Sequence, residues 1–112
     1  DGAYFISLLS NNITVMNSTT LAVINIISSP FLQGPRDIIF LNNGQTMVVA
    51  GYSNDYLVFF NRSTPDSTSY SFIYRIPFSY RSPFGLWRVN DTFFYGTSYA
   101  NNTVLAYSAV NS

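Results

Sequence analysis

An internal repeat with a period of about 45 residues constrains this chain more than any other feature of its sequence. The segment that begins at Pro35 matches the one that begins at Pro83 in its proline, its apolar positions and the Asn-rich turn that follows. The start of the chain, residues 1–15, runs parallel to residues 91–105 without a gap. Repeats of this length form propeller blades or solenoid turns, in which each unit buries its apolar face only against a neighbour.

Each repeat contains short β-prone runs that are separated by turn residues. The Asn43-Gly44 pair predicts a tight hairpin with a primed turn, because such a turn needs residues that tolerate positive φ. Asn54-Asp55 predicts a similar hairpin, and the prolines of residues 30–35 and 77–83 predict links that end strand pairing. In the most complete unit we therefore expect strands at residues 37–41, 46–50, 56–60 and 70–76.

These runs predict an all-β fold of antiparallel four-stranded propeller blades, about two and a half blades of an incomplete or multi-chain β-propeller. Lys and Glu are absent and β-branched and aromatic residues are abundant, which favours strands over helices. The predicted units are a partial blade at 1–30, which holds the second to fourth strands, a complete blade at 31–77, and a partial blade at 78–112, which holds the first three strands. We expect other copies of the chain, or the rest of a longer polypeptide, to cover the exposed edges. A start within a blade favours a piece of a longer protein.

The central repeat resembles a blade of the NHL-repeat β-propellers. The likeness covers the proline and apolar strand of residues 34–40, the Asn-Gly turn, and residues 48–59, with their Val-Ala strand and Asn-rich turn. The next repeat departs from this pattern, because Phe84-Gly85 replace Arg36-Asp37. Together with the period, the resemblance implies part of a propeller.

Asparagine sequons provide a clue to the compartment. Charged residues make up only 9% of the chain, so that N-linked glycans would supply the water-facing surface that charges do not. The sequons fall in or beside predicted turns and not in predicted strand interiors, as exposed acceptors should. Chance matches in a chain rich in Asn, Ser and Thr are the alternative. We expect N-linked glycans and a secreted or cell-surface protein, with acceptors at Asn12, Asn17, Asn61, Asn90 and Asn101.

Composition excludes several functions. The net charge is zero and no basic cluster is present, so we expect no nucleic-acid partner. The longest apolar runs, such as 47–50 and 57–60, are far shorter than the roughly 18 residues of a membrane helix, so we expect no membrane span. Histidine and cysteine are absent, which excludes Ser-His and Cys-His catalysis within the chain and removes the usual zinc ligands.

Aspartates are the remaining candidates for acid-base or metal chemistry. Asp37 stands at a strand start and Asp55 and Asp91 stand in turns, where Asp caps backbone amides. We interpret all of the candidates as structural: Asp37, Asp55, Asp66 and Asp91. Calcium bound around Asn54-Asp55 is the alternative, although no dense acidic loop is present. We expect no cofactor and no metal. Arg36 beside Asp37 predicts a local ion pair or turn bond.

Aromatic residues near the loops of one propeller face indicate where a carbohydrate or peptide could bind. The candidates are Tyr52, Phe78, Tyr80, Arg81 and Tyr99. Packing between sheets is the interpretation that we favour for each of these rings, and also for Trp87, which lies within a predicted strand.

The favoured function is a non-enzymatic structural or interaction module of an extracellular N-glycosylated repeat protein, which could assemble into a ring or filament. A carbohydrate- or peptide-binding propeller face is the alternative. An enzyme would require residues outside this chain.

Overall fold

The computed structural model describes residues 3–7, 11–53, 55–64, 69–78, 82–98 and 103–108. These residues form strands and turns, and no helix occurs among them. The strands are β1 (Ala3–Ser7), β2 (Asn12–Asn17), β3 (Val23–Ser28), β4 (Pro35–Leu41), β5 (Thr46–Gly51), β6 (Tyr56–Arg62), β7 (Tyr70–Pro77), β8 (Pro83–Arg88), β9 (Phe93–Ser98) and β10 (Thr103–Ser108).

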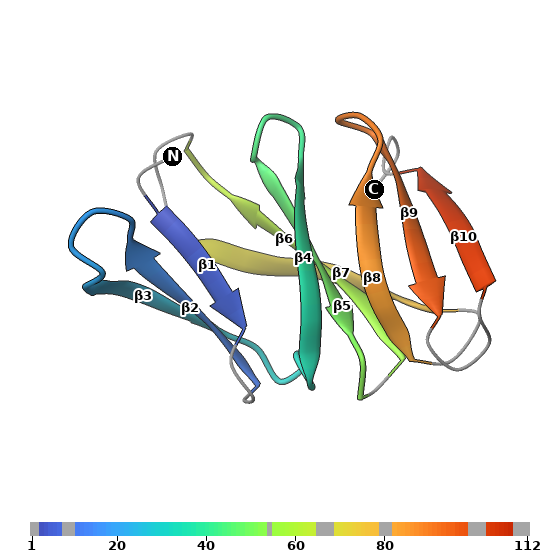
Figure 1. Cartoon of the computed structure of the whole chain (residues 1–112), viewed down its shortest axis with the longest axis horizontal. Helices are drawn as coiled ribbons and strands as arrows, with labels where there is room; N and C mark the ends of the chain where they lie inside the picture. Colours follow the sequence, from blue (N-terminus) through green and yellow to red (C-terminus); the bar gives the residue numbers. More distant parts are fainter. Residues whose placement is uncertain are drawn as a thin grey trace.

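The strands form three antiparallel sheets, in the orders β1-β2-β3, β4-β5-β6-β7 and β10-β9-β8. Figure 1 shows the sheets side by side in chain order, with the four-stranded sheet in the middle. This architecture confirms the prediction of an all-β fold, and it is consistent with partial propeller blades. The strands of the central sheet begin and end within two residues of their predicted positions. The division into units at residues 30/31 and 77/78 stays a prediction.

The turn between β4 and β5 has the primed geometry that its sequence predicts. Asn43 and Gly44 have φ of 55° and 81°, and the amide of Gln45 donates to the carbonyl of Asn42 over 3.0 Å. Both central residues therefore lie in the left-handed region, which glycine and asparagine tolerate best. The turn fixes the register in which Leu41 pairs with Thr46.

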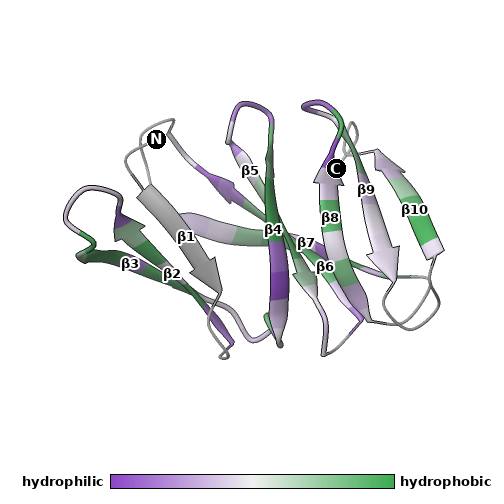
Figure 2. Ribbon diagram, in the orientation of Figure 1, coloured by the Kyte–Doolittle hydropathy of each residue, from purple (hydrophilic) through white to green (hydrophobic). Residues whose placement is uncertain are grey.

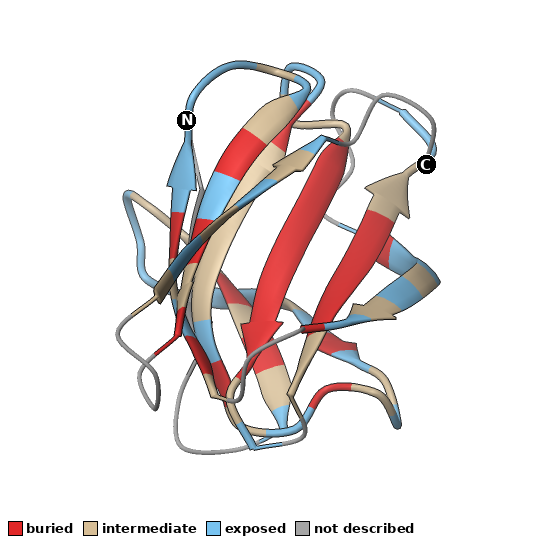
Figure 3. Ribbon diagram, turned by 90° about the vertical axis from the view of Figure 1, so that its right-hand side faces the viewer, coloured by how far each residue is buried: buried red, intermediate tan, exposed pale blue. Residues whose placement is uncertain are grey.

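The central sheet is buried on both faces, because successive residues of a strand point to opposite sides. In Figure 3 the strand that is red along its whole length is β5, in which every residue is buried. We call the packing between β1–β3 and β4–β7 the first seam and the packing between β4–β7 and β8–β10 the second seam. Buried residues of the first seam are Ile13, Val15, Ile27, Leu32, Met47, Val49, Val58, Phe60 and Tyr70. Those of the second seam are Leu41, Val48, Ala50, Leu57, Phe59, Phe78, Leu86 and Phe94.

The link before β4 depends on Gly34. Its φ is +58°, and a Cβ atom there would lie 2.2 Å from Oγ of Ser53. The amide of Tyr52 donates to the carbonyl of Gly34 over 3.1 Å, and that of Ser53 donates to the carbonyl of Gln33 over 3.2 Å. The link therefore holds the loop after β5 in place, and with it the side chain of Tyr52.

Trp87 departs from its predicted core position. It lies within β8, as expected, but it is 73% exposed. Its strand neighbour Leu86 points into the second seam and is buried. Because neighbouring residues point to opposite faces, Trp87 lies on the face of β8 that points away from the central sheet. The prediction of core packing was wrong for Trp87 because none of the three described sheets packs on that face.

Candidate functional site

Arg36 and two aromatic rings form a surface cluster, which we call the Arg36 cluster. The guanidinium carbon of Arg36, in β4, lies 5.1 Å from the ring centre of Tyr52 and 4.7 Å from that of Phe84. The two rings are 6.3 Å apart and meet edge to face. Tyr52 follows β5 and Phe84 belongs to β8, so that the cluster joins the central sheet to the last one. A guanidinium and partly exposed aromatic rings are the groups that stack on sugars and planar ligands.

The structure places the predicted ligand residues in different surroundings. Tyr52 is half-buried and belongs to the Arg36 cluster. Phe78 is only 5% exposed and its ring stacks on Tyr107 at 6.1 Å between centroids, which agrees with the packing interpretation. The other three candidates, Tyr80, Arg81 and Tyr99, lie outside the described residues.

Asp37 serves the structure, and it does not fit the expected pairing with Arg36. Its Oδ1 accepts a hydrogen bond from the amide of Ile38 and its Oδ2 accepts one from the amide of Leu86, both over 2.8 Å. Arg36 instead lies over the two rings described above. Asp37 thus ties the first strand of the central sheet to the first strand of the last sheet.

The other aspartates that the structure describes also make structural contacts. Oδ1 of Asp55 accepts from the amide of Ser82 over 2.7 Å, which holds the end of the link before β8. Asp91 pairs with Arg88, and its carbonyl accepts from the amide of Asn42 over 3.2 Å. Asp66 and Asn54 lie outside the described residues, and within the described part no group of three His, Cys, Asp or Glu side chains could hold a metal.

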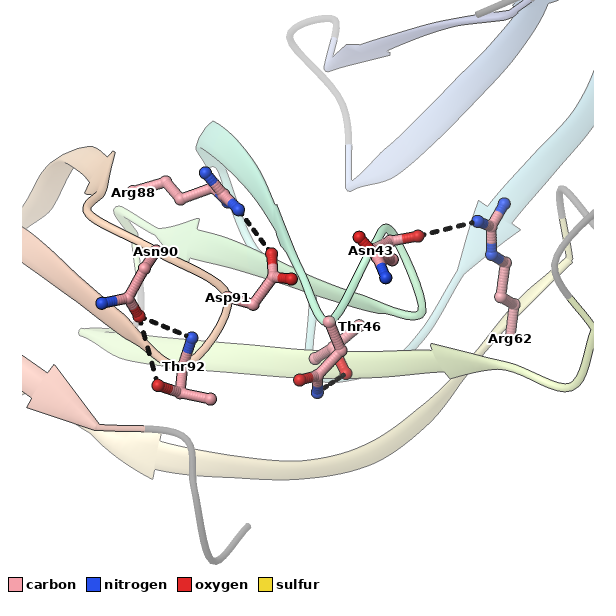
Figure 4. Close-up of polar contacts among 8 residues, drawn as sticks. Asn43, Thr46, Arg62, Arg88, Asn90, Asp91 and Thr92 are labelled. Atoms are coloured by element: carbon pink, nitrogen blue, oxygen red, sulfur yellow. Dashed lines mark hydrogen bonds and ion pairs between the residues drawn. The ribbon is translucent and has the colours of Figure 1, made fainter.

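Polar contacts gather where the β4–β5 and β8–β9 turns lie close together (Figure 4). The hydrogen bond from Arg88, together with one from the backbone amide of Asn43, holds the pKa of the Asp91 carboxyl below its ordinary value. Arg62 donates to the carbonyl of Asn43 over 3.4 Å. These contacts join turns and strand ends, and they leave no converging set of groups around a common centre.

The sequons lie closer to strands than the sequence predicts. Asn12 and Asn17 are the first and last residues of β2, and Asn61 lies inside β6, where it pairs with Thr46 and accepts a 2.8 Å hydrogen bond from the Thr46 hydroxyl. The expectation that sequons avoid strand interiors was therefore wrong for Asn61. Asn90 lies in the expected turn and is exposed, and Asn101 lies outside the described residues.

Asn90 also shows a compact local geometry. Its side-chain oxygen accepts hydrogen bonds from the amide of Thr92 over 2.9 Å and from the Thr92 hydroxyl over 3.2 Å (Figure 4). The side-chain oxygen of Asn17 likewise accepts from the amides of Thr19 and Thr20. In both sequons the oxygen is engaged by the following turn, an arrangement typical of Asx turns.

The outer faces of the two end sheets carry exposed apolar side chains. Figure 2 shows hydrophobic bands on β3 at one end of the molecule and on β10 at the other. We call the two surfaces the β3 face and the β8–β10 face. The β3 face includes Val23, Ile24 and Ile26, and the β8–β10 face includes Trp87, Tyr95 and Val104.

No family model matches the chain, and no curated protein sequence matches it. Several solved structures match the chain in fold. A proposed 6-phosphogluconolactonase from Bacteroides uniformis superposes with a TM-score of 0.79 at 16% sequence identity, over 96% of this chain and 33% of that chain. A functionally unknown protein from Desulfotomaculum acetoxidans gives a TM-score of 0.75 at 14% identity, with the same coverage of both chains.

The chain has a propeller-like fold. At these identities the likeness shows the fold alone, and the chain spans about a third of the length of the two solved proteins. The resemblance to NHL repeats stays a prediction. None of the described segments forms a helix of membrane-spanning length and hydropathy.

Proposed function

We propose that this chain is a non-enzymatic structural or interaction module of an extracellular, N-glycosylated repeat protein, and that it packs against further sheets of its own kind in a ring or filament. The observation that carries this proposal is the exposure of large apolar side chains on both outer faces, with Trp87 at 73% and Ile26 at 55%. Single exposed apolar residues are ordinary, but several on one sheet face mark an interaction surface.

The polar residues of the structure support the same function. The described aspartates cap amides or pair with a neighbouring turn, and Arg36 and Arg75 lie over aromatic rings beside the seams. These side chains therefore serve packing. Their arrangement favours a module that holds sheets together.

Analytical ultracentrifugation of the purified chain tests the assembly. We expect a weight-average mass that exceeds that of the 12.6 kDa chain and rises with protein concentration. The control is the double variant Trp87→Asp and Val104→Asp, which places charges on the β8–β10 face without touching either seam. A wild-type chain that stays monomeric at all concentrations would overturn the proposed assembly.

The extracellular, glycosylated part of the proposal has a separate test. We expect the mass of the chain produced in a secretory host to fall on enzymatic removal of N-linked glycans, with Asn90 modified because it is exposed in its turn. Peptide mapping assigns the sites, and Asn90→Gln is the matched control. An unchanged mass would refute glycosylation and leave the assembly test unaffected.

A carbohydrate- or peptide-binding face is the second candidate, and the Arg36 cluster is the observation that favours it. We expect any sugar or peptide bound by the chain to stack on Tyr52 or Phe84, because both rings carry the Arg36 guanidinium beside them. Tyr52→Ala should then weaken binding about fivefold, since ring stacking contributes roughly 1 kcal/mol. Tyr95→Ala, an exposed tyrosine outside the cluster, is the control. Equal binding by both variants, or no binding on a glycan array, would remove this candidate.

Lactone hydrolysis is the activity that the name of the Bacteroides protein raises. The present chain covers a third of that protein and has no histidine. We expect 6-phosphogluconolactone to hydrolyse in its presence at the rate seen in buffer alone. A protein-dependent rate that scales with concentration would contradict the non-enzymatic proposal.

A further inference from the structure

Strand pairing shows which positions of the central and last sheets are equivalent. Ile39 of β4 pairs with Val48 of β5, and Trp87 of β8 pairs with Tyr95 of β9. Pro35 and Pro83 begin the first strands of the two sheets, so Trp87 occupies the place of Ile39 and Tyr95 that of Val48. The two pairs therefore lie on the same face of their sheets, the face turned toward the next sheet along the chain.

Equivalent residues are fully or partly buried in the central sheet and exposed in the last one. Val48 is fully buried and Ile39 packs against the second seam. Their counterparts Tyr95 and Trp87 are 39% and 73% exposed. The β8–β10 face is therefore a copy of an interface that the molecule already contains, without the sheet that covers it.

The β3 face is the opposite kind of surface. Ile13, Val15 and Ile27 point from the first sheet into the first seam, so that sheet is covered on the side turned toward the next one. Ile26, which pairs with Thr14, points the other way and is exposed. The uncovered surfaces at the two ends of the molecule are thus the two complementary halves of a sheet-to-sheet contact.

We propose that a second copy of this chain packs its β3 face on the β8–β10 face, head to tail, so that the contact repeats the arrangement of the two seams. This inference rests on the proposed function and adds the partner and its orientation. A symmetric contact would pair two like faces, an arrangement found at neither seam. A head-to-tail contact uses two different surfaces and leads to a ring when it closes and to a filament when it does not.

Electrostatics and glycans bear on this contact. The residues named for the two faces are uncharged, so no like charges oppose one another across it. Asn12 pairs with Ser28 and lies on the same side of β2 as Thr14, and so on the side of Ile26. A glycan on Asn12 would stand in the contact, and we expect assembled chains to carry none there.

Two single variants and their mixture test the orientation. Both are made in an Asn12→Gln background: Trp87→Asp disables the β8–β10 face, and Ile26→Asp disables the β3 face. Because both residues are exposed, each variant should keep the strand signal in circular dichroism and the unfolding midpoint of the background chain. We expect each variant alone to be monomeric by sedimentation and an equimolar mixture to form one-to-one dimers and nothing larger.

The other outcomes are distinct. Self-association of either variant alone would show that one face pairs with itself and would overturn the head-to-tail orientation while leaving assembly intact. A mixture that stays monomeric, beside a background chain that assembles, would overturn these two faces as the contact. A background chain that is itself monomeric would overturn the proposed assembly.

Discussion

Tyr107 places a polar atom in an apolar seam. Its ring stacks on Phe94 at 5.3 Å between centroids, and its hydroxyl is buried with no hydrogen-bond partner among the described residues. Burial raises the pKa of this phenol to about 12 from its ordinary 10.0. Tyr70 shows the contrasting case, because its hydroxyl donates to the carbonyl of Gly44. Two tyrosines in similar seams thus differ in whether their hydroxyl is satisfied.

Tyr107→Phe should therefore stabilise the chain. It removes an unsatisfied buried hydroxyl and keeps the ring stack, so we expect the free energy of unfolding at pH 7 to rise by about 1 kcal/mol. Tyr70→Phe is the matched control and should lower it by about 1 kcal/mol, because it deletes a hydrogen bond. Urea unfolding measures both. Equal effects of the two substitutions would contradict this account.

Tyr107→Phe also tests how the raised pKa of Tyr107 affects the dependence of stability on pH. The folded state holds the Tyr107 proton more tightly than the unfolded state, whose pKa is 10.0, so its contribution is complete below pH 10 and is lost as pH rises toward about 12. The unfolding free energy of the wild type should therefore fall faster than that of Tyr107→Phe between pH 10 and 12. Parallel curves for the two proteins would count against the raised pKa.

Single residues show where sequence reasoning succeeded and failed. The positive φ of Gly44 follows from residue type and spacing alone, and it was predicted. The two aromatic rings that contact Arg36 lie far from it in the sequence. The sequence therefore suggested the neighbouring Asp37 as its ion-pair partner. Trp87 fits a strand, but the sequence pattern does not tell whether a neighbouring sheet covers its face.

At the level of elements, short β-prone runs and turn residues predicted the strand positions of the central sheet. Prolines predicted the links between the sheets. The end of β6 was predicted two residues too early. Asn61 and Arg62 continue the strand because its pairing uses backbone hydrogen bonds, which polar side chains do not prevent. The contact from Asp37 in β4 to β8 was also missed, since nothing local marks it.

Asp37 should contribute more to the free energy of unfolding than its place at a predicted strand start indicates. Asp37→Ala leaves the amides of Leu86 and Ile38 without their acceptors, and we expect it to cost about 1–3 kcal/mol of unfolding free energy. Asp37→Asn keeps one acceptor oxygen and should cost less. Urea unfolding gives the ranking, and faster amide hydrogen exchange at Leu86 locates the effect. Asp91→Asn, which weakens the exposed contacts of this carboxyl with Arg88 and with the backbone of Asn43, should change stability little.

The whole molecule is a stack of sheets in which the central one serves two seams. Phe59 and Phe60 are neighbours in β6, but Phe59 packs in the second seam and Phe60 in the first. The chain spans about a third of the length of the two solved proteins with this fold.

Phe59→Leu and Phe60→Leu should therefore loosen opposite ends of the molecule. Each substitution removes similar buried volume, and we expect a loss of about 1–2 kcal/mol of unfolding free energy in both cases. Native-state hydrogen exchange should accelerate in β9 and β10 for Phe59→Leu and in β2 and β3 for Phe60→Leu. Identical exchange patterns would show that the two seams open as one cooperative unit.

Arg75 and Arg36 illustrate a consequence for the environments this molecule tolerates. The guanidinium carbon of Arg75 lies 4.6 Å from the ring centre of Phe31 and 4.1 Å from that of Tyr56, beside the first seam, as Arg36 does beside the second. Attraction between a cation and a ring quadrupole needs no carboxylate, so it does not vanish when acid protonates one. Acidification of the surroundings should therefore leave both of these cation–ring contacts intact.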